Sequence, residues 1–222
     1  MSQPTVESDT SAPDNATPWM RILLQKKEEI KAAVNNENFS AVPHLISAAQ
    51  VHLSNHPKAN HRSNLFSSGA AGEPFEELKI GLTDVAKVIE TEMASFRAYV
   101  IAMRDDPTVG NQPSKMAPKM KGRIEDTKRA INAKIDVTTD DAVAKIENMP
   151  VDLQDSAADA FIGCMDLITD ALDTLMGVLH EAEGKVTAIA SGDVSVLDTG
   201  SNTVKTTVND TLAAINGIFA SA

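Results

Sequence analysis

Residues 161–186 read FIGCMDLITDALDTLMGVLHEAEGKV and form the most regular stretch of the chain. Their apolar residues recur at alternating intervals of four and three, the spacing that places side chains on one face of an α-helix. The pattern continues on both sides, which predicts a single helix over about 151–191, roughly 60 Å long if it is unbroken. Gly177 and Gly184 are the expected places for a bend.

A stripe of this kind can pack against the chain's own helices, against a second copy, or against an apolar ligand. Cys164, Ala171 and Val178 flank the main stripe on one side, and Ile162 and Met176 widen it on the other. A two-stranded coiled coil needs only a narrow seam, whereas this width favours a helix with two or three neighbours. We therefore expect helix 151–191 to be internal and packed against its own chain.

Helical spacing also dominates the rest of the sequence. It predicts helices at about 17–34, 40–54, 75–104, 115–135, 138–149 and 201–219. Thr138 and Asp141 fit a capping box that would start the short helix before Pro150. Residues 192–200 are expected to form a turn because they begin and end with glycine. In helix 75–104, Tyr99 belongs to the apolar stripe and Glu92 interrupts it.

The predicted fold class is therefore all-α, an elongated antiparallel bundle of about 5–7 helices, one of them near 40 residues long. Helices 75–104, 115–135, 151–191 and 201–219 are expected to form a four-helix layer. Residues 1–16 are rich in Ser, Thr, Pro and Asp and are predicted to be a disordered polar tail. Residues 17–222 form the single predicted domain, which includes a long polar loop at 55–74.

Composition limits the kinds of core and partner. Apolar residues make up 42% of the chain but aromatics only 4%, so aliphatic residues and nine methionines must fill the core. The net charge of −11 argues against binding to nucleic acid. Neither a Sec signal peptide nor a run of 18 apolar residues is present, so we expect a cytoplasmic or otherwise soluble protein without an integral membrane segment, although leaderless secretion stays open.

Charge is distributed unevenly between two predicted helices. Residues 146–184 contain nine acidic residues and neither Lys nor Arg, whereas 115–135 is strongly basic. We expect the acidic helix to lie beside the basic one, which would make the segment KMAPKMKGR (115–123) a solvated face. The alternative is a patch for anionic lipid or nucleic acid. The absence of aromatic residues near this segment in the sequence weakens the nucleic-acid alternative.

Catalytic and metal-binding patterns are weak. His52, His56 and His61 are the weak candidates for a metal site, but they lack an HExxH pattern and Pro57 interrupts the helix there, so we predict no metal site and no cofactor. Cys164 lies on the apolar flank, which is typical of a buried and inert thiol. No catalytic residue is predicted.

The sequence favours a non-enzymatic structural or interaction protein that presents helix faces to a protein partner or to itself. One alternative is a carrier that holds a hydrophobic small molecule or lipid between its helices. The candidate lining residues are then Met93, Phe96, Phe161, Met165 and Met176. A second alternative is an enzyme with a site near the histidine-bearing loop at 52–61.

Overall fold

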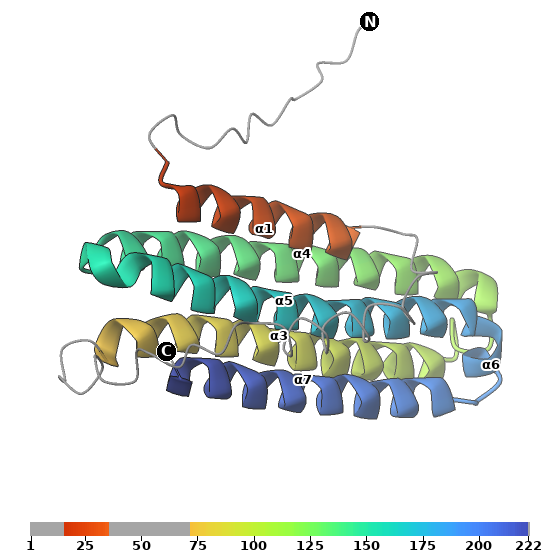
Figure 1. The fold of residues 1–222 in the computed structure, drawn as a ribbon. Helices are drawn as coiled ribbons and strands as arrows, with labels where there is room; N and C mark the ends of the chain where they lie inside the picture. Colours follow the sequence, from red (N-terminus) through yellow and green to blue (C-terminus); the bar gives the residue numbers. More distant parts are fainter. Residues whose placement is uncertain (1–15, 36–71, 222) are drawn as a thin grey trace, which may run out of the picture.

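The computed structural model describes residues 16–35 and 72–221 (Figure 1). It places them in six helices, which confirms the predicted all-α fold. The helices are α1 (Pro18–Asn35), α3 (Gly72–Asp105), α4 (Pro113–Glu147), α5 (Val151–Gly184), α6 (Val186–Ala190) and α7 (Ser195–Ser221). The predicted helix at 40–54 and most of the predicted tail and loop lie outside the described residues.

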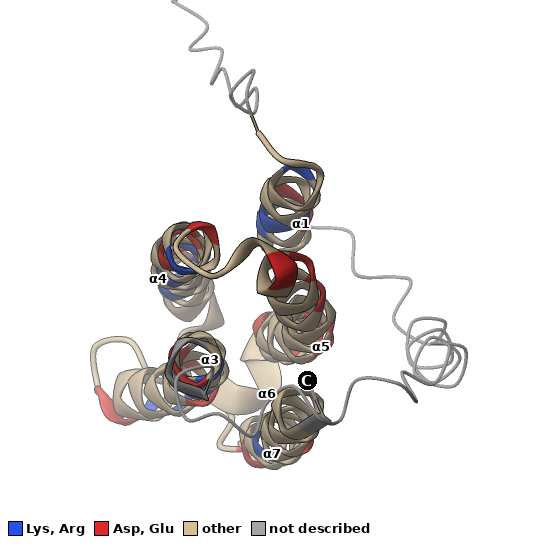
Figure 2. Ribbon diagram, turned by 60° about the vertical axis from the view of Figure 1, so that its left-hand side comes forward, with Lys and Arg blue, Asp and Glu red and all other residues tan. Residues whose placement is uncertain are grey.

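The four long helices α3, α4, α5 and α7 form an elongated antiparallel bundle (Figure 1). Residues 106–112 join α3 to α4, and residues 148–150 join α4 to α5, so each short connection reverses the chain. The short helix α6 lies at one end, between α5 and α7. Helix α1 lies outside the four-helix layer, along the groove between α4 and α5 (Figure 2).

The predicted apolar stripes meet in the centre of the bundle. On α5, seven residues of the stripe are at most 4% exposed: Phe161, Met165, Ile168, Leu172, Leu175, Leu179 and Ala182. On α4, Met116, Met120, Ile124, Ile131 and Ile135 are at most 2% exposed. Helix α5 contacts α1, α3, α4 and α7, which confirms that its wide stripe packs against its own chain.

The predicted helix start at Thr138 is wrong. Helix α4 runs without interruption from Pro113 to Glu147, and Thr138 is buried in its interior. The reason is that the helical register of Ile131 and Ile135 continues through this segment and outweighs the local capping pattern. A Cβ on Gly81 would lie 3.2 Å from the Thr138 Cγ2 atom, so α3 packs closely on α4 here.

The predicted boundaries after Gly184 also need correction. The backbone at Lys185 (φ −99°, ψ 17°) ends α5, so the expected helix of about 40 residues is a 34-residue helix followed by α6. Gly192 has a φ of +100°, and the Asp193 N–H donates to the Ala188 carbonyl (3.0 Å), the hydrogen bond of a Schellman motif. The turn is therefore short, and α7 begins at Ser195 instead of 201.

Candidate interaction surface

A shallow groove between α3 and α4 carries exposed apolar side chains. Ile80 and Val137 are 51% and 57% exposed and both line a hollow of about 150 Å³. Two ion pairs cross the groove, and they join Lys134 to Asp84 (3.6 Å) and Lys145 to Glu77 (3.4 Å). This part of the groove thus has an apolar centre and a charged rim.

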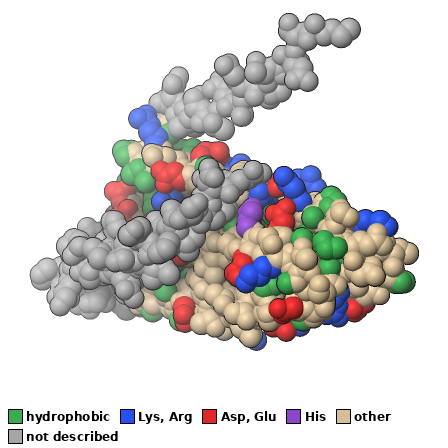
Figure 3. All heavy atoms as spheres, turned by 90° about the vertical axis from the view of Figure 1, so that its right-hand side faces the viewer, with side chains coloured by type: hydrophobic (Ala, Val, Ile, Leu, Met, Phe, Trp, Pro, Cys, Tyr) green, Lys and Arg blue, Asp and Glu red, His purple; other side chains and the backbone are tan. Residues whose placement is uncertain are grey.

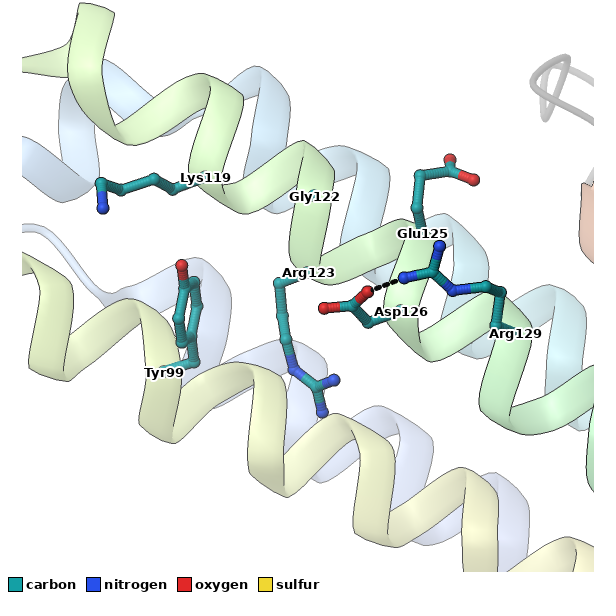
Figure 4. A pocket seen from close by; sticks show the side chains of 7 residues that line it. All are labelled: Tyr99, Lys119, Gly122, Arg123, Glu125, Asp126 and Arg129. Carbon is teal, nitrogen blue, oxygen red and sulfur yellow. Dashed lines mark hydrogen bonds and ion pairs between the residues drawn. The ribbon is translucent and has the colours of Figure 1, made fainter.

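A second hollow, of about 380 Å³, lies further along the same two helices (Figure 4). Tyr99 lines it from α3, and Lys119 and Arg123 line it from α4. The prediction that Tyr99 belongs to the core is wrong, because its side chain is 38% exposed and its neighbour Val100 is fully buried. No aromatic residue lies near the basic segment 115–123 in the sequence. In the folded protein, Tyr99 of α3 places an aromatic ring beside this segment.

Glu92, which interrupts the apolar stripe of α3, forms a polar link to α4. Its Oε2 atom accepts hydrogen bonds from Arg123 Nη2 (2.8 Å) and Thr127 Oγ1 (2.9 Å). Arg123 also donates to Ser95 Oγ (2.9 Å). The side chains of Glu92 and Arg123 are both largely buried. Each therefore supplies the opposite charge that the other needs within the α3–α4 interface. A cation of the basic segment is thereby directed toward α3.

The acidic helix α5 lies beside the basic helix α4, as predicted, but the ion pairs between helices join each of them to other helices. Among the ion pairs of the described residues, none joins α4 to α5. Basic residues of α4 pair with α3, while acidic residues of α4 and α5 pair with α1. The shortest of the pairs with α1 are Lys26–Asp166 (2.7 Å), Lys27–Asp140 (3.1 Å) and Lys31–Asp136 (2.9 Å). The reason is that α1 covers the outer seam between α4 and α5, where their carboxylates gather.

Asp170 lies one turn beyond Asp166 on α5, and its carboxylate forms no ion pair with any described residue. Burial, together with the negative charges of Asp173 and Asp166, raises the pKa of Asp170 to about 6. Burial also raises the pKa of Asp173 above its usual range. Because the pKa of Asp170 is raised on folding, the contribution of Asp170 to stability falls as pH rises from about 4 to 6 and stays lower above that range.

We therefore expect Asp170→Asn to stabilise the protein at pH 7. After allowance for solvent screening of a half-buried group, the gain is about 1 kcal/mol, or a rise of about 2–4 °C in melting temperature. Thermal unfolding followed by circular dichroism at pH 7 and at pH 4 measures it, and the gain should vanish at pH 4. Asp159→Asn removes an exposed carboxylate of the same helix. Equal effects of the two variants at pH 7 would contradict the assignment.

The candidate ligand-lining residues lie in the core. Met93 and Phe96 come from α3, and Phe161, Met165 and Met176 come from α5; all five are at most 4% exposed. Phe161 also lines the hollow beside Val137, whereas the other four line neither of the two hollows described above. Cys164 is fully buried, and burial raises the pKa of its thiol to about 12, which keeps it protonated at neutral pH.

The candidate metal-binding histidines His52, His56 and His61 lie outside the described residues. Within 16–35 and 72–221, no group of three or more His, Cys, Asp or Glu side chains is arranged to hold a metal ion. His180 lies on α5 with its Nδ1 atom 2.8 Å from the Met176 carbonyl oxygen.

Basic, acidic and apolar side chains lie interspersed on the end of the molecule that Figure 3 shows.

No known family model matches the chain, and no curated protein or solved structure resembles it at a significant level. Among the described helices, none is both long and apolar enough to cross a bilayer. The described residues offer two surfaces for binding, the α3–α4 groove and the α4–α5 groove that holds α1.

Proposed function

We propose that this protein is a non-enzymatic interaction protein that presents helix faces to a protein partner or to itself. The observation that supports this most directly is the α3–α4 groove, where Ile80 and Val137 remain exposed between two ion pairs. An apolar centre with a charged rim is the usual composition of a protein-binding surface. Apolar side chains that are exposed together and rimmed by polar residues, as Ile80 and Val137 are here, mark candidate sites of protein–protein contact.

The core favours this function over a hydrophobic-ligand carrier. The five residues that would line a ligand site all belong to one continuous hydrophobic core cluster. Side chains at most 4% exposed are accounted for by their role in the core. The α3–α4 groove, in contrast, has apolar surface that the fold itself does not use.

The variant Val137→Glu tests the groove directly. It places a carboxylate at the apolar centre without touching the core, because Val137 is 57% exposed. We expect the fold to be retained, with a change in stability within about 0.5 kcal/mol, and binding of the partner or self-association to weaken at least about tenfold. Native mass spectrometry and quantitative affinity purification with the full chain measure these two forms of binding.

Val151→Glu is the matched control, because Val151 is a more exposed valine (82%) at the start of α5. Binding that survives Val151→Glu and is lost with Val137→Glu would support the proposal. A small molecule of a few hundred daltons that stays bound to both variants and leaves on denaturation would favour the carrier instead. If neither variant changes any association of the chain, the groove is not the binding surface.

A further inference from the structure

Helix α1 lies in the groove between α4 and α5, outside the layer of four long helices, and its buried residues join the same core cluster. Its buried apolar residues form one stripe along the helix: Trp19, Met20, Leu23, Ile30 and Val34. They lie against α4 and α5, and residues 36–71 separate α1 from α3 in the sequence. The molecule thus shows how this groove binds an amphipathic helix, by burying one apolar stripe.

Aspartates on both sides of the α4–α5 groove select a helix that carries basic residues. Three lysines of α1 contact aspartates on both rims, with Asp136 and Asp140 on α4 and Asp166 on α5. The two rims therefore carry negative charge on either side of an apolar floor. A helix that fits must combine an apolar stripe with basic residues on both of its flanks, and α1 does so with lysines at positions 26, 27 and 31.

The direction of α1 follows from its contacts with α4. Lys27 lies 3.1 Å from Asp140. Lys31, one turn later in α1, binds Asp136, which lies one turn earlier in α4. Further along, the side-chain amide of Asn132 on α4 donates a hydrogen bond to Oδ1 of Asn35, the last residue of α1 (3.1 Å). Helix α1 therefore runs antiparallel to α4 and parallel to α5.

Two carboxylates of α5 that lie beside α1 have no basic partner on that helix. Lys26 is level with Asp166, because their side chains form an ion pair. Two turns further along each helix, Ala33 is level with Asp173, and Asp170 lies between the two levels. Ala33 has the same angular position on α1 as Lys26, seven residues earlier, but it carries no charge. Asp170 and Asp173 thus lie on the rim beside α1 without an ion pair in the described part of the chain.

We propose that the groove between α4 and α5 is a binding site for a basic amphipathic helix of a partner protein, and that such a helix displaces α1. The partner helix carries the apolar stripe and flanking lysines of α1 and adds a basic residue at the position of Ala33, where it meets Asp170 and Asp173. This second surface rests on the proposed interaction function. It lies on the α1-facing side of α4, away from the hollow around Val137, so each surface can be tested alone.

Trp19 makes the displacement visible in the full-length protein. It is the single tryptophan of the chain and is 6% exposed in the docked helix, so its emission reports whether α1 is in the groove. The probe is a synthetic peptide of residues 16–35 with Trp19→Phe, which removes its own signal, and Ala33→Lys. We expect a saturable red shift of the protein's emission on titration, while far-UV circular dichroism shows that the bundle stays folded.

The peptide with Ala33 retained is the first control. We expect it to bind about three- to tenfold more weakly, the effect of one added ion pair at a half-buried carboxylate. Replacing Asp170 and Asp173 with Asn in the protein should abolish this difference. A second control peptide carries Lys26→Glu, Lys27→Glu and Lys31→Glu on the same apolar stripe, and it should not displace α1.

Three results would overturn the proposal. The first is an unchanged Trp19 emission up to about 1 mM peptide, the range of effective concentration for a tethered helix. The second is equal displacement by the charge-reversed peptide, which would leave only unspecific apolar binding. The third is a dimer in which Trp19 stays buried and α1 is exchanged, because the occupant would then be a second copy. The effect of Val137→Glu on partner binding is independent of all three.

Discussion

Replacing Leu172 with Asp is expected to unfold the entire bundle. Leu172 lies in the middle of α5 and is 1% exposed, and α5 contacts α1, α3, α4 and α7. A carboxylate at this position would be removed from water without a partner, which costs more than about 5 kcal/mol. This approaches the whole stability of a typical domain. Far-UV circular dichroism of the purified variant should show that most of the helix content is lost.

Two further variants separate burial from the introduction of charge. Leu172→Met conserves volume and is expected to cost less than about 1.5 kcal/mol. Val151→Asp introduces the same carboxylate on the same helix at an 82% exposed position and should leave the fold intact. If Leu172→Asp gave a folded monomer that only failed to associate, the α5 stripe would be an intermolecular surface and its internal position would be wrong.

The four-helix core follows from the sequence because each long helix carries an apolar stripe that must be buried. The stripe of α5 is wide enough to require several neighbours, and these are the helices that contact it. Local patterns were less reliable than periodicity. The capping pattern at Thr138 competes with a helical register that spans the whole of α4, and the register determines the structure because it buries apolar area over many turns.

The two surfaces could not be derived from the sequence in the same way. Lys26 and Asp166 are far apart in the chain, and no local rule pairs them. The position of α1 in the α4–α5 groove, not the net charge of each helix, decides which carboxylates meet a lysine. The sequence alone does not show that Val137 is exposed beside α3, because this depends on how α3 and α4 pack. The weak metal-site candidates His52, His56 and His61 lie outside the described residues, so the absence of a metal site there stays a prediction.

Gly200 illustrates how close packing can be mistaken for a turn. The glycines at 192 and 200 predict a turn, yet Gly200 lies within α7 and packs against α5. A Cβ built on Gly200 would lie 2.2 Å from the Val178 Cγ1 atom, closer than any real contact. Glycine is therefore required here by the approach of the two helices, and its backbone is helical.

We expect Gly200→Ala to destabilise the protein by about 1–3 kcal/mol, because the added methyl group must push apart a stiff β-branched side chain and a packed helix. The sign is diagnostic, since Gly→Ala inside a helix normally stabilises by up to about 1 kcal/mol. Gly163→Ala on α5, where a Cβ would meet open space, should show that normal gain. Chemical denaturation followed by circular dichroism measures both variants.

The double variant Gly200→Ala with Val178→Ala tests whether this contact is the cause. Removing the Val178 methyl groups makes room for the new Cβ, so the second substitution should recover part of the loss. A double-mutant cycle is expected to give a favourable coupling above about 1 kcal/mol. Additive effects would mean that Val178 does not oppose the alanine. A stabilising Gly200→Ala would show that α5 and α7 lie further apart than the packing at this position requires.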